Sequence, residues 1–405
     1  MIERYSTPGF TALLVLGIMV IGSNSFLLSP ILTDVAHALQ TKPVVVARVI
    51  SAYGAATAVS AFLFAGRIDR LGARPMLVTS AAVMAMALLG SAAGQSWQAL
   101  ALCQALAGLA AGVMLPAIYA TAIAAAPPGQ DAHLLGRVLN GWALSLVAGV
   151  PISALLTEHL DWRVTYLALA ALAACAAAGF LRLPRATQTR PDEPLIAPVR
   201  AFRIPGVARL LIVCLCYMTA FYGTYAFLGD HVRHVTGVGA GTAGLVVLGY
   251  GTGFGLAGFL GRRVDRVGPA RVFPGVLACL ALIYLVMSPA TATLAGAIGI
   301  ATIWGMANHL GLNILVLLLS SRRPEARGAI LGLHSSATYL SVFSGPLVLG
   351  VAYARMGFDA VTLVASILLV GAALLVLGAR HRAVSVTAVH SRSAETRPAV
   401  RESSK

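Results

Sequence analysis

Apolar segments of about 20 residues recur along almost the whole chain, and this pattern constrains the fold more than any other feature. An α-helix of that length crosses a hydrocarbon core roughly 30 Å thick. Only 11% of the 405 residues are charged and the mean hydropathy is +0.85, whereas a soluble domain has about 25% charged residues. The sequence therefore predicts an all-α membrane protein with twelve transmembrane helices.

The apolar segments divide into two sets of six. We expect the first six helices near residues 9–32, 44–65, 75–94, 97–122, 134–158 and 163–182. We expect the second six near residues 207–230, 240–261, 271–288, 291–320, 328–352 and 359–379. The chain is thus predicted to form a six-helix bundle over 1–182, a cytoplasmic linker over 183–206, a second bundle over 207–380 and a polar, disordered tail over 381–405.

The net charge of +15 is unevenly divided between the two sides of this topology. Twenty-four of the 29 Lys and Arg residues, with nine acids, fall on the side of the termini. The other side has five basic residues and five acids. Cytoplasmic loops carry such an excess of Lys and Arg, so both termini are expected in the cytoplasm and the protein in the cell inner (plasma) membrane. A nucleic-acid-binding role would need a soluble basic module, and no loop is long enough for one.

Cysteine and histidine do not have the spacing of a chemical site. All five cysteines fall inside predicted spans, so we expect neither a disulfide framework nor a metal site. The nine histidines form no pattern typical of an enzyme, and the sequence lacks the GxxxxGK[ST] phosphate loop of ATP-driven pumps. We therefore expect no cofactor. The first apolar run lacks a small-residue cleavage site and is interpreted as the first helix, not as a signal peptide.

A charged turn occurs twice, once in each half. "FAGRIDRLGARPML" covers residues 64–77 and "FLGRRVDRVGPARV" covers 259–272, so that Asp69 and Asp265 are 196 residues apart. Asp34 and Asp230 have the same separation. Two homologous halves related by an axis along the membrane normal are typical of transporters whose substrate site lies between the halves.

Several segments resemble the major facilitator superfamily. "GRIDRLGARP" is similar to the family's loop between helices 2 and 3, and "LNGWALSLVAGVPISALLTEHLDWRVTYLALA" resembles helices 5 and 6 of its drug and metabolite efflux branch, which includes arabinose-efflux-like and purine-efflux-like proteins. "IGSNSFLLSPILTDVA" and "RRPEARGAILGLHSSATYLSVFSGP" fit helices 1 and 10–11. The resemblance extends to Arg380. It implies two pseudo-symmetric six-helix bundles, and it favours a monomer.

The resemblance also implies a gating role for the two charged turns. In this family the loop acts as a clasp between the two bundles on the cytoplasmic face, and its contacts break when the transporter opens inward. The alternative is a basic membrane anchor with an acid for solubility. Gly72 and Gly268 would permit the tight turns, and Asp69 and Asp265 could pair with arginines or a helix N-terminus. The residues concerned are Asp69, Arg70, Gly72, Arg74, Asp265, Arg266 and Gly268.

Asp34, Asp230 and His231 are the candidates for proton coupling. The two aspartates are the only acids in helices 1 and 7, and a carboxylate near hydrocarbon can act as a proton carrier. The alternative is that each is a solvated acid at a helix end. Neighbouring His231, Arg233 or His234 could pair with Asp230. The efflux branch often has an acid where this chain has Ser25 and an arginine where it has Gln104, so the cavity is expected to be neutral.

Polar residues at mid-membrane depth are candidates for the substrate cavity. For each residue the alternative is an ordinary interhelical hydrogen bond. The candidates are Asn24, Tyr53, Gln104, Asn140, Tyr222, Tyr225, Asn308, His309, Asn313, His334 and Thr338. In helix 5, Gly149 and Pro151 match a family motif, and we expect this helix to pack closely on the glycine-rich helix 8.

These observations together predict a secondary transporter that exchanges a small neutral or weakly cationic molecule, such as a drug, nucleoside or sugar, for protons. An uncoupled facilitator or an uptake permease is the nearest alternative. An intramembrane enzyme would need clustered acids or metal ligands. A non-transporting receptor or scaffold would need neither two matched charged turns nor a polar cavity.

Overall fold

The computed structural model describes residues 8–64, 72–126, 131–183, 198–260, 266–323 and 326–395, and all regular structure in these ranges is helical. The first part contains α1 (Pro8–Phe26), α2 (Leu28–Ala38), α3 (Pro43–Phe64), α5 (Ala73–Ala93), α6 (Trp97–Ala125), α7 (Asp131–Leu144), the π-helix η2 (Ser145–Gly149), α8 (Val150–His159) and α9 (Trp162–Phe180). The second part contains α10 (Pro198–Phe202), α11 (Val207–Thr236), α12 (Ala240–Leu256), the 3₁₀-helix η3 (Ala257–Leu260), α14 (Pro269–Ala290), α15 (Leu294–Ser320), α16 (Arg327–Met356) and α17 (Phe358–Glu395).

Eleven helical stretches among the described residues are long and apolar enough to cross a membrane. The segment expected to form a twelfth span, near 240–261, contains the apolar helix α12, which has 17 residues and is shorter than the others. It then tightens into η3. Glycine is a poor helix former because it loses the most backbone freedom on folding. Five of the ten residues from Gly249 to Gly258 are glycines.

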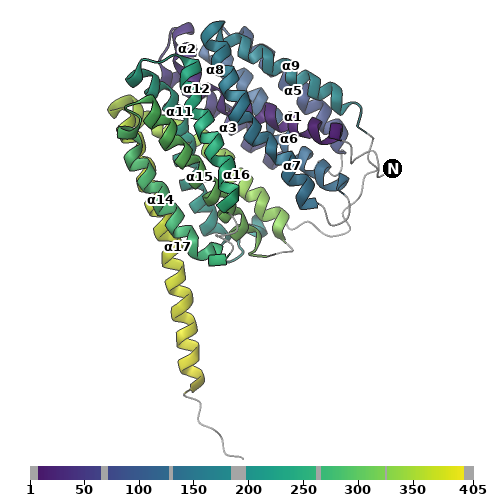
Figure 1. Cartoon of the computed structure of the whole chain (residues 1–405). Coiled ribbons are helices and arrows are strands. Elements are labelled where there is room, and N and C mark those ends of the chain that lie inside the picture. Colours follow the sequence, from purple (N-terminus) through teal and green to yellow (C-terminus); the bar gives the residue numbers. More distant parts are fainter. Residues whose placement is uncertain are drawn as a thin grey trace, which may run out of the picture.

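Successive spans run in opposite directions, because the connections at one end contain only one to four residues. That end holds Asp34, Glu158 and Arg233, and we call it the acidic end. The other end holds the longer connections and most of the arginines, and we call it the arginine-rich end. Figure 1 shows α2, α8, α11 and α12 gathered at the acidic end.

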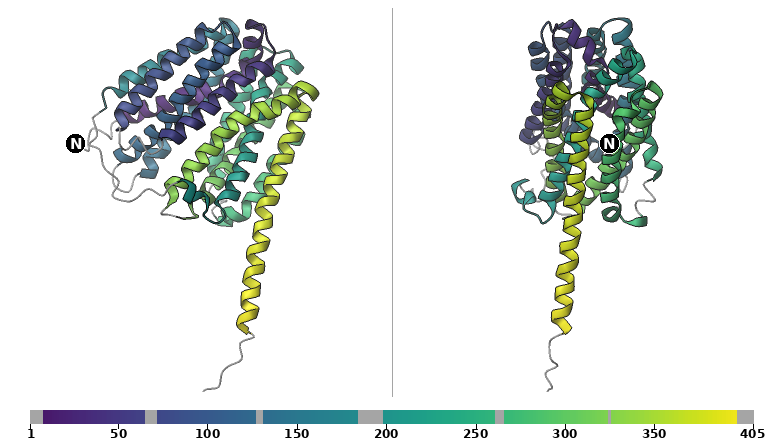
Figure 2. Two further views of the ribbon diagram at one scale, coloured as in Figure 1. Left: turned by 180° about the vertical axis from the view of Figure 1, so that it is seen from behind. Right: turned by 90° about the vertical axis from the view of Figure 1, so that its left-hand side faces the viewer.

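The helices form two groups that lie side by side. In the first group α3 packs on α6 and α5 packs on α6 and α9; in the second, α11 packs on α16, α12 on α15 and α14 on α17. Figure 2 shows the purple-to-blue helices beside the green-to-yellow ones. The main contacts that join the groups are those of α3 with α16, α2 with α11, and α12 with α8 and η2; smaller ones join α12 to α2 and α7, and α11 to α3.

The first span is broken between α1 and α2, where a single helix was expected over 9–32. Pro30 has no backbone N–H and leaves the carbonyl four residues earlier, that of Phe26, without its helical donor. The hydroxyl of Tyr225 in α11 donates to this Phe26 carbonyl at 3.3 Å. A membrane offers no water to satisfy such a group, so the break in α1 is stabilised by the second group of helices.

The fifth span also changes its hydrogen bonding at a proline. The Val150 N–H donates to the Ser145 carbonyl, five residues back, across the π-helix η2. Pro151, at the start of α8, has no N–H to donate. In membrane helices a local π-helical adjustment can satisfy the backbone groups that a proline leaves without a partner. The expected helix over 134–158 is therefore three consecutive pieces, α7, η2 and α8.

The last helix is longer than expected. A span was predicted to end near residue 379 and a disordered tail to follow over 381–405, but α17 continues to Glu395. Figures 1 and 2 show this extension projecting away from the other helices. A polar helix without neighbours is only marginally stable in water, so the proposed disorder of the tail stays a prediction.

Glycines allow the closest approach between α12 and α15. A Cβ atom on Gly253 would lie 1.9 Å from the Thr302 carbonyl oxygen, whereas a Cβ on Gly255 would meet nothing within 4 Å. Gly253→Ala would therefore push the two helices apart, at a cost of about 1–3 kcal/mol.

We expect Gly253→Ala to lower the melting temperature of the protein in detergent micelles by several degrees. Gly255→Ala, two residues along the same helix, is the matched control, and its melting temperature should be unchanged or slightly higher because Ala is the better helix former. Equal melting temperatures for the two variants would contradict the close α12–α15 packing.

Candidate functional site

An ion pair joins the two groups of helices at the acidic end. Arg233 of α11 donates to both carboxylate oxygens of Asp34 in α2, from Nη2 to Oδ1 at 2.9 Å and from Nη1 to Oδ2. Its Nη1 also donates to the Pro30 carbonyl at 3.3 Å. The side chains of Arg233 and Asp34 are 15% and 31% exposed. Because two-point pairs of this kind are geometrically specific, this contact fixes the crossing of α2 and α11.

Asp230 lies at the same crossing but has hydroxyl partners. Thr33 of α2 donates to its Oδ1 at 2.7 Å, and the Tyr353 hydroxyl of α16 donates to its Oδ2. Arg233 was one of three expected partners of Asp230, and it pairs with Asp34 instead. His231, the third candidate for proton coupling, places Nε2 3.0 Å from the Thr291 hydroxyl and stacks on Phe358 at 4.2 Å.

Equivalent positions of the two halves touch at this crossing. The Ser29 hydroxyl of α2 donates to the carbonyl of Tyr225 in α11, 196 residues later, which is the separation of the repeated sequence motifs. A Cβ on Gly229 would lie 2.4 Å from the Ser29 carbonyl oxygen, so the two backbones are as close as glycine permits. Ser29 and Tyr225 thus have the separation that the sequence repeat predicts for equivalent positions.

A second contact between the groups lies at the start of α12. The Gly241 N–H donates to the carboxylate of Glu158, at the end of α8. A helix N-terminus carries partial positive charge and unsatisfied N–H groups, so Glu158 caps α12 from the other group. Further along α12, a Cβ on Gly244 would lie 3.0 Å from the Ala154 Cβ, and a Cβ on Gly251 would lie 3.0 Å from the Leu146 Cβ.

Toward the arginine-rich end, no described residue covers the same interface. Gly255 of α12 and Gly258 of η3 lie one and two turns after Gly251, and a Cβ on either would meet nothing within 4 Å. On the facing α7, Asn140 lies two turns before Val147, which contacts Gly251. Asn140 is exposed. Among the described residues, the surface between α12–η3 and α7–η2–α8 is thus closed at the acidic end and open at the arginine-rich end.

The two helix-5 motif residues have different neighbours. A Cβ on Gly149 would lie 2.0 Å from the Ser23 hydroxyl of α1, so Gly149 packs inside the first group. The Pro151 backbone is 3.4 Å from the Cβ position of Gly244 in α12, so Pro151 lies in the interface between the groups. The expected packing of this helix on glycines of α12 is present at Gly244 and Gly251. Gly249 and Gly253 of α12 face α15 within the second group instead.

The charged turns are described in part. Gly72 and Gly268 have φ angles of 86° and 97°, a backbone region that favours glycine. Arg74 donates from Nη2 to the Leu181 carbonyl at the end of α9, so it binds within the first group. Arg266 is exposed. The proposed clasp residues Asp69, Arg70 and Asp265 lie outside the described residues.

Polar candidates of the first group form a buried chain. Asn24 Nδ2 donates to Gln104 Oε1 at 2.9 Å, and Gln104 Nε2 donates to the Ser91 hydroxyl at 3.0 Å. Next to it, the Ser25 hydroxyl lies 3.0 Å from the hydroxyl of Tyr53. The side-chain amide oxygen of Asn24, Oδ1, is buried and has no hydrogen-bond partner among the described residues. Such a group is satisfied by water or by a ligand.

The second group has a similar set. Asn308 donates to the Tyr250 hydroxyl at 3.3 Å, and its backbone carbonyl accepts from Tyr217 at 2.7 Å. The rings of His309 and Phe254 pack edge to face, with their centroids 4.5 Å apart. Within the described ranges, Asn308 Oδ1, His309 Nδ1 and His334 Nε2 are buried without a hydrogen-bond partner. The i,i+4 residues Asn313 and Thr338 differ in environment: Asn313 is exposed, and the Thr338 hydroxyl donates to the His334 carbonyl at 3.0 Å.

An aromatic cluster connects the two groups. Phe26 at the end of α1 stacks on Tyr222 with ring centroids 6.2 Å apart, and its edge meets Tyr225 at 5.1 Å. Phe221 stacks on Tyr250, with ring centroids 5.6 Å apart, and so extends the cluster to α12. The structure thus brings the candidates Tyr222 and Tyr225 together, while Asn140 lies apart on the uncovered face of α7.

Sequence reasoning did not identify several of these residues. Glu158, Thr33 and Tyr353 make contacts between or beside the groups, and Phe26 and Tyr250 lie in the aromatic cluster. Glu158 had a usable signal, because it is an acid at the end of one span opposite the glycines that begin another. No three His, Cys, Asp or Glu side chains in the described part of the chain come together as metal ligands would.

We expect the Asp34–Arg233 pair to show energetic coupling in a double-mutant cycle. Asp34→Asn and Arg233→Gln should each lower stability in detergent, and the coupling should be about 1 kcal/mol because both side chains are largely buried. Asp161 and Arg163 are the control pair, at 3.6 Å and more exposed, and should show no measurable coupling. Additive effects of the Asp34 and Arg233 substitutions would contradict a stabilising pair.

Comparison with known proteins agrees with this architecture. The sequence model of the Major Facilitator Superfamily matches residues 14–346. YwfA of Bacillus subtilis (strain 168), an uncharacterized MFS-type transporter, is 29% identical over 372 residues, which are 90% of this chain and 89% of YwfA. The crystal structure of the human organic anion transporter MFSD10 (TETRAN) has a similar fold, with a TM-score of 0.67 and 18% identity, over 92% of this chain and 100% of that chain. The chain therefore belongs to the major facilitator superfamily and is a membrane transporter of that type.

Proposed function

We propose that this protein is a secondary active transporter of the drug and metabolite efflux branch, which exports a small molecule by alternating access in exchange for protons. In this proposal its twelve helices, α12 with η3 included, form two pseudo-symmetric six-helix bundles and work as a monomer. The arginine-rich end faces the cytoplasm, because basic residues accumulate on that side of membrane proteins. In this proposal both termini lie in the cytoplasm and the protein resides in the cell inner (plasma) membrane.

The observation that carries this proposal is the difference between the two ends of the surface between α12–η3 and α7–η2–α8. At the acidic end Gly241, Gly244 and Gly251 are in contact with the first group, whereas no described residue covers Gly255 or Gly258. One continuous stripe of small residues is thus half packed. In the other state of the cycle, we propose, the bundles rock so that the Gly255–Gly258 part packs and the Gly241–Gly251 part separates.

The chemistry of the buried polar residues favours a neutral or weakly cationic substrate. Asn24, Asn308, His309 and His334 each offer a neutral atom without a protein partner in the described residues, and aromatic rings lie close to this layer. A planar compound with hydrogen-bonding groups, such as a nucleoside or an aromatic drug, suits these side chains. MFSD10 is named as an organic anion transporter, so an anionic compound is the second candidate.

Alternating access predicts that locking the acidic end stops transport. Gly244→Cys with Ala154→Cys, in a variant without the five native cysteines, would place two thiols where the Cβ atoms are 3.0 Å apart, close to disulfide geometry. We expect oxidation to lower transport at least about tenfold and reduction to restore it, since a disulfide that persists removes one of the two states. The assay follows export from proteoliposomes of a compound first identified by thermal stabilisation.

The control pair is Gly249→Cys with Thr302→Cys, which joins α12 to α15 inside one group, where the Cβ position of Gly249 is 3.0 Å from the Thr302 hydroxyl. Its oxidation should leave transport unchanged because a bundle is proposed to move as a rigid body. Continued transport after complete formation of the 154–244 disulfide would rule out alternating access at this interface.

Proton coupling is proposed to depend on Asp34 and Asp230. Both accept hydrogen bonds that hold the acidic end closed, and a protonated carboxyl would lose its charge attraction for Arg233 or accept fewer hydrogen bonds. Binding of a proton would therefore favour opening of that end, which is the coupling that exchange requires.

Asp34→Asn and Asp230→Asn should abolish transport driven by an imposed pH gradient and preserve substrate counterflow in vesicles. Asp161→Asn is the control, because Asp161 is a half-buried acid at the same end that caps α9 and Asn caps a helix equally well. If both variants still respond to the gradient, the coupling assignment is wrong. If the wild-type protein ignores the gradient, it is an uncoupled facilitator.

A further inference from the structure

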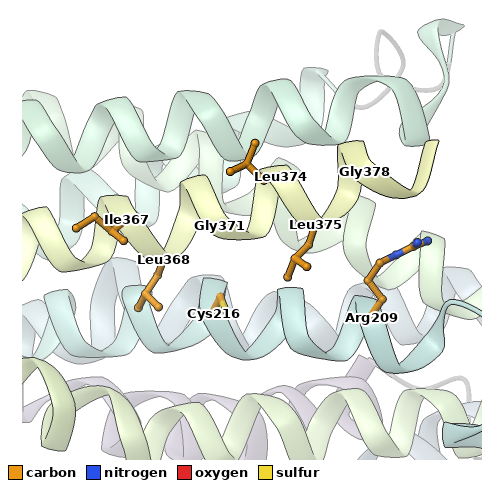
Figure 3. A pocket seen from close by; sticks show the side chains of 8 residues that line it. All are labelled: Arg209, Cys216, Ile367, Leu368, Gly371, Leu374, Leu375 and Gly378. Atoms are coloured by element: carbon orange, nitrogen blue, oxygen red, sulfur yellow. The ribbon is translucent and has the colours of Figure 1, made fainter. Parts of the chain in front are cut away.

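A groove on the outer surface of the second group differs from the site described above. It lies between α11 and α17, has a volume of about 650 Å³ and includes Arg209 and Cys216 of α11 (Figure 3). The α17 side of the groove contains Gly371, Gly378 and several leucine and isoleucine side chains. Both helices are long and apolar enough to cross a membrane, and the lining side chains Ile367 and Leu374 are 61% and 62% exposed, so the groove faces lipid.

Two glycines leave the groove open. Gly371 and Gly378 are two helical turns apart and therefore lie on one face of α17. A Cβ on either would meet nothing within 4 Å. The side chains beside these glycines are partly exposed: Ile367 is 61% and Leu375 is 40% exposed. The result is a narrow apolar channel along α17 that no part of the described chain fills.

The length of the groove matches one leaflet of a bilayer. Ile367 and Gly378 bound it on α17, and eleven residues of helix rise about 16 Å. Half of a hydrocarbon core is about 15 Å. The groove therefore runs from near the middle of the membrane to the arginine-rich end, which is the path of one lipid acyl chain.

The groove ends in a positive charge. Of the described residues that line it, Arg209 alone is charged, and Figure 3 shows its guanidinium directed toward the Gly378 end of α17. A long arginine side chain near a helix end can reach the polar interface of the membrane. The sequence adds Arg380 and Arg382 just after Gly378 on the same helix. Basic residues near the membrane surface attract anionic lipids, and each one raises the binding constant about fivefold.

We propose that this groove binds an anionic phospholipid from the leaflet at the arginine-rich end. One acyl chain lies along Gly371 and Gly378, and Arg209 holds the phosphate. A second copy of this chain is a poorer occupant, because eight residues line the groove whereas a stable protein interface involves about 20–30 residues a side. The binding site does not depend on which molecule the protein transports.

Native mass spectrometry of the full-length protein in detergent tests the proposal. The probes are phosphatidylglycerol and phosphatidylcholine with the same acyl chains. We expect the wild-type protein to retain phosphatidylglycerol more tightly. Arg209→Gln should weaken phosphatidylglycerol binding about fivefold and leave phosphatidylcholine unchanged, and Arg209→Lys should keep most of the preference because it keeps the charge.

Filling the groove tests the acyl-chain path separately. Gly371→Leu should weaken binding of both lipids, and Gly371→Ala should do so to a smaller extent if the leucine variant folds poorly. Controls are Gly299→Leu on α15, where a Cβ also meets nothing within 4 Å, and Arg271→Gln at the exposed start of α14. Equal binding of the two lipids by the wild-type protein would overturn the proposal, as would unchanged binding in Arg209→Gln or in both Gly371 variants. A dimer that disappears in Gly371→Leu would identify a second copy as the occupant instead.

Discussion

A bilayer core offers no hydrogen-bond partners, and this constraint determines how the chain can change direction or bend. Each backbone amide within the spans must be bonded by the protein itself. Where Pro30 interrupts the ladder of the first span, the freed Phe26 carbonyl accepts from Tyr225 of the other group. Where Pro151 interrupts the fifth span, the ladder shifts to the wider spacing of η2. Irregular backbone is thus found where a neighbouring helix or a local shift satisfies it.

The breaks also determine where the two groups meet. Because α2 begins after the break in the first span, its axis is free to cross α11, and Ser29, Thr33 and Asp34 all bond to that helix. The bonds at the crossing combine a charge pair with hydroxyl–carboxylate contacts. Glu158 adds a third point at the start of α12. The helices between these points are mostly apolar, so a small number of polar contacts holds the acidic end closed.

The fold could be predicted from the sequence because apolar length and glycine or proline position are strong local signals. Eleven of the predicted spans meet the length and composition of membrane helices, and the weaker α12 is the one richest in glycine. The separation of 196 residues predicted that Asp34 and Asp230 occupy equivalent places, and both lie at one crossing. It could not predict their partners, because a partner depends on how each helix is rotated and tilted. Phe26 and Tyr250 were missed for a related reason: every face of a membrane helix is apolar, so an aromatic residue gives no direction. Proton coupling, substrate and gating roles stay predictions.

The contact between Ser29 and Tyr225 has an evolutionary consequence. In an ancestor with two identical halves, one mutation at such a position would have changed both sides of the contact at once. Once the halves were joined in one polypeptide, each side could diverge independently. The position equivalent to Arg233 is His37, which is exposed and leaves Asp230 to Thr33 and Tyr353. The repeat of 196 residues thus relates an ionic junction, Asp34 with Arg233, to a junction in which the Asp230 carboxylate accepts hydrogen bonds from neutral hydroxyls.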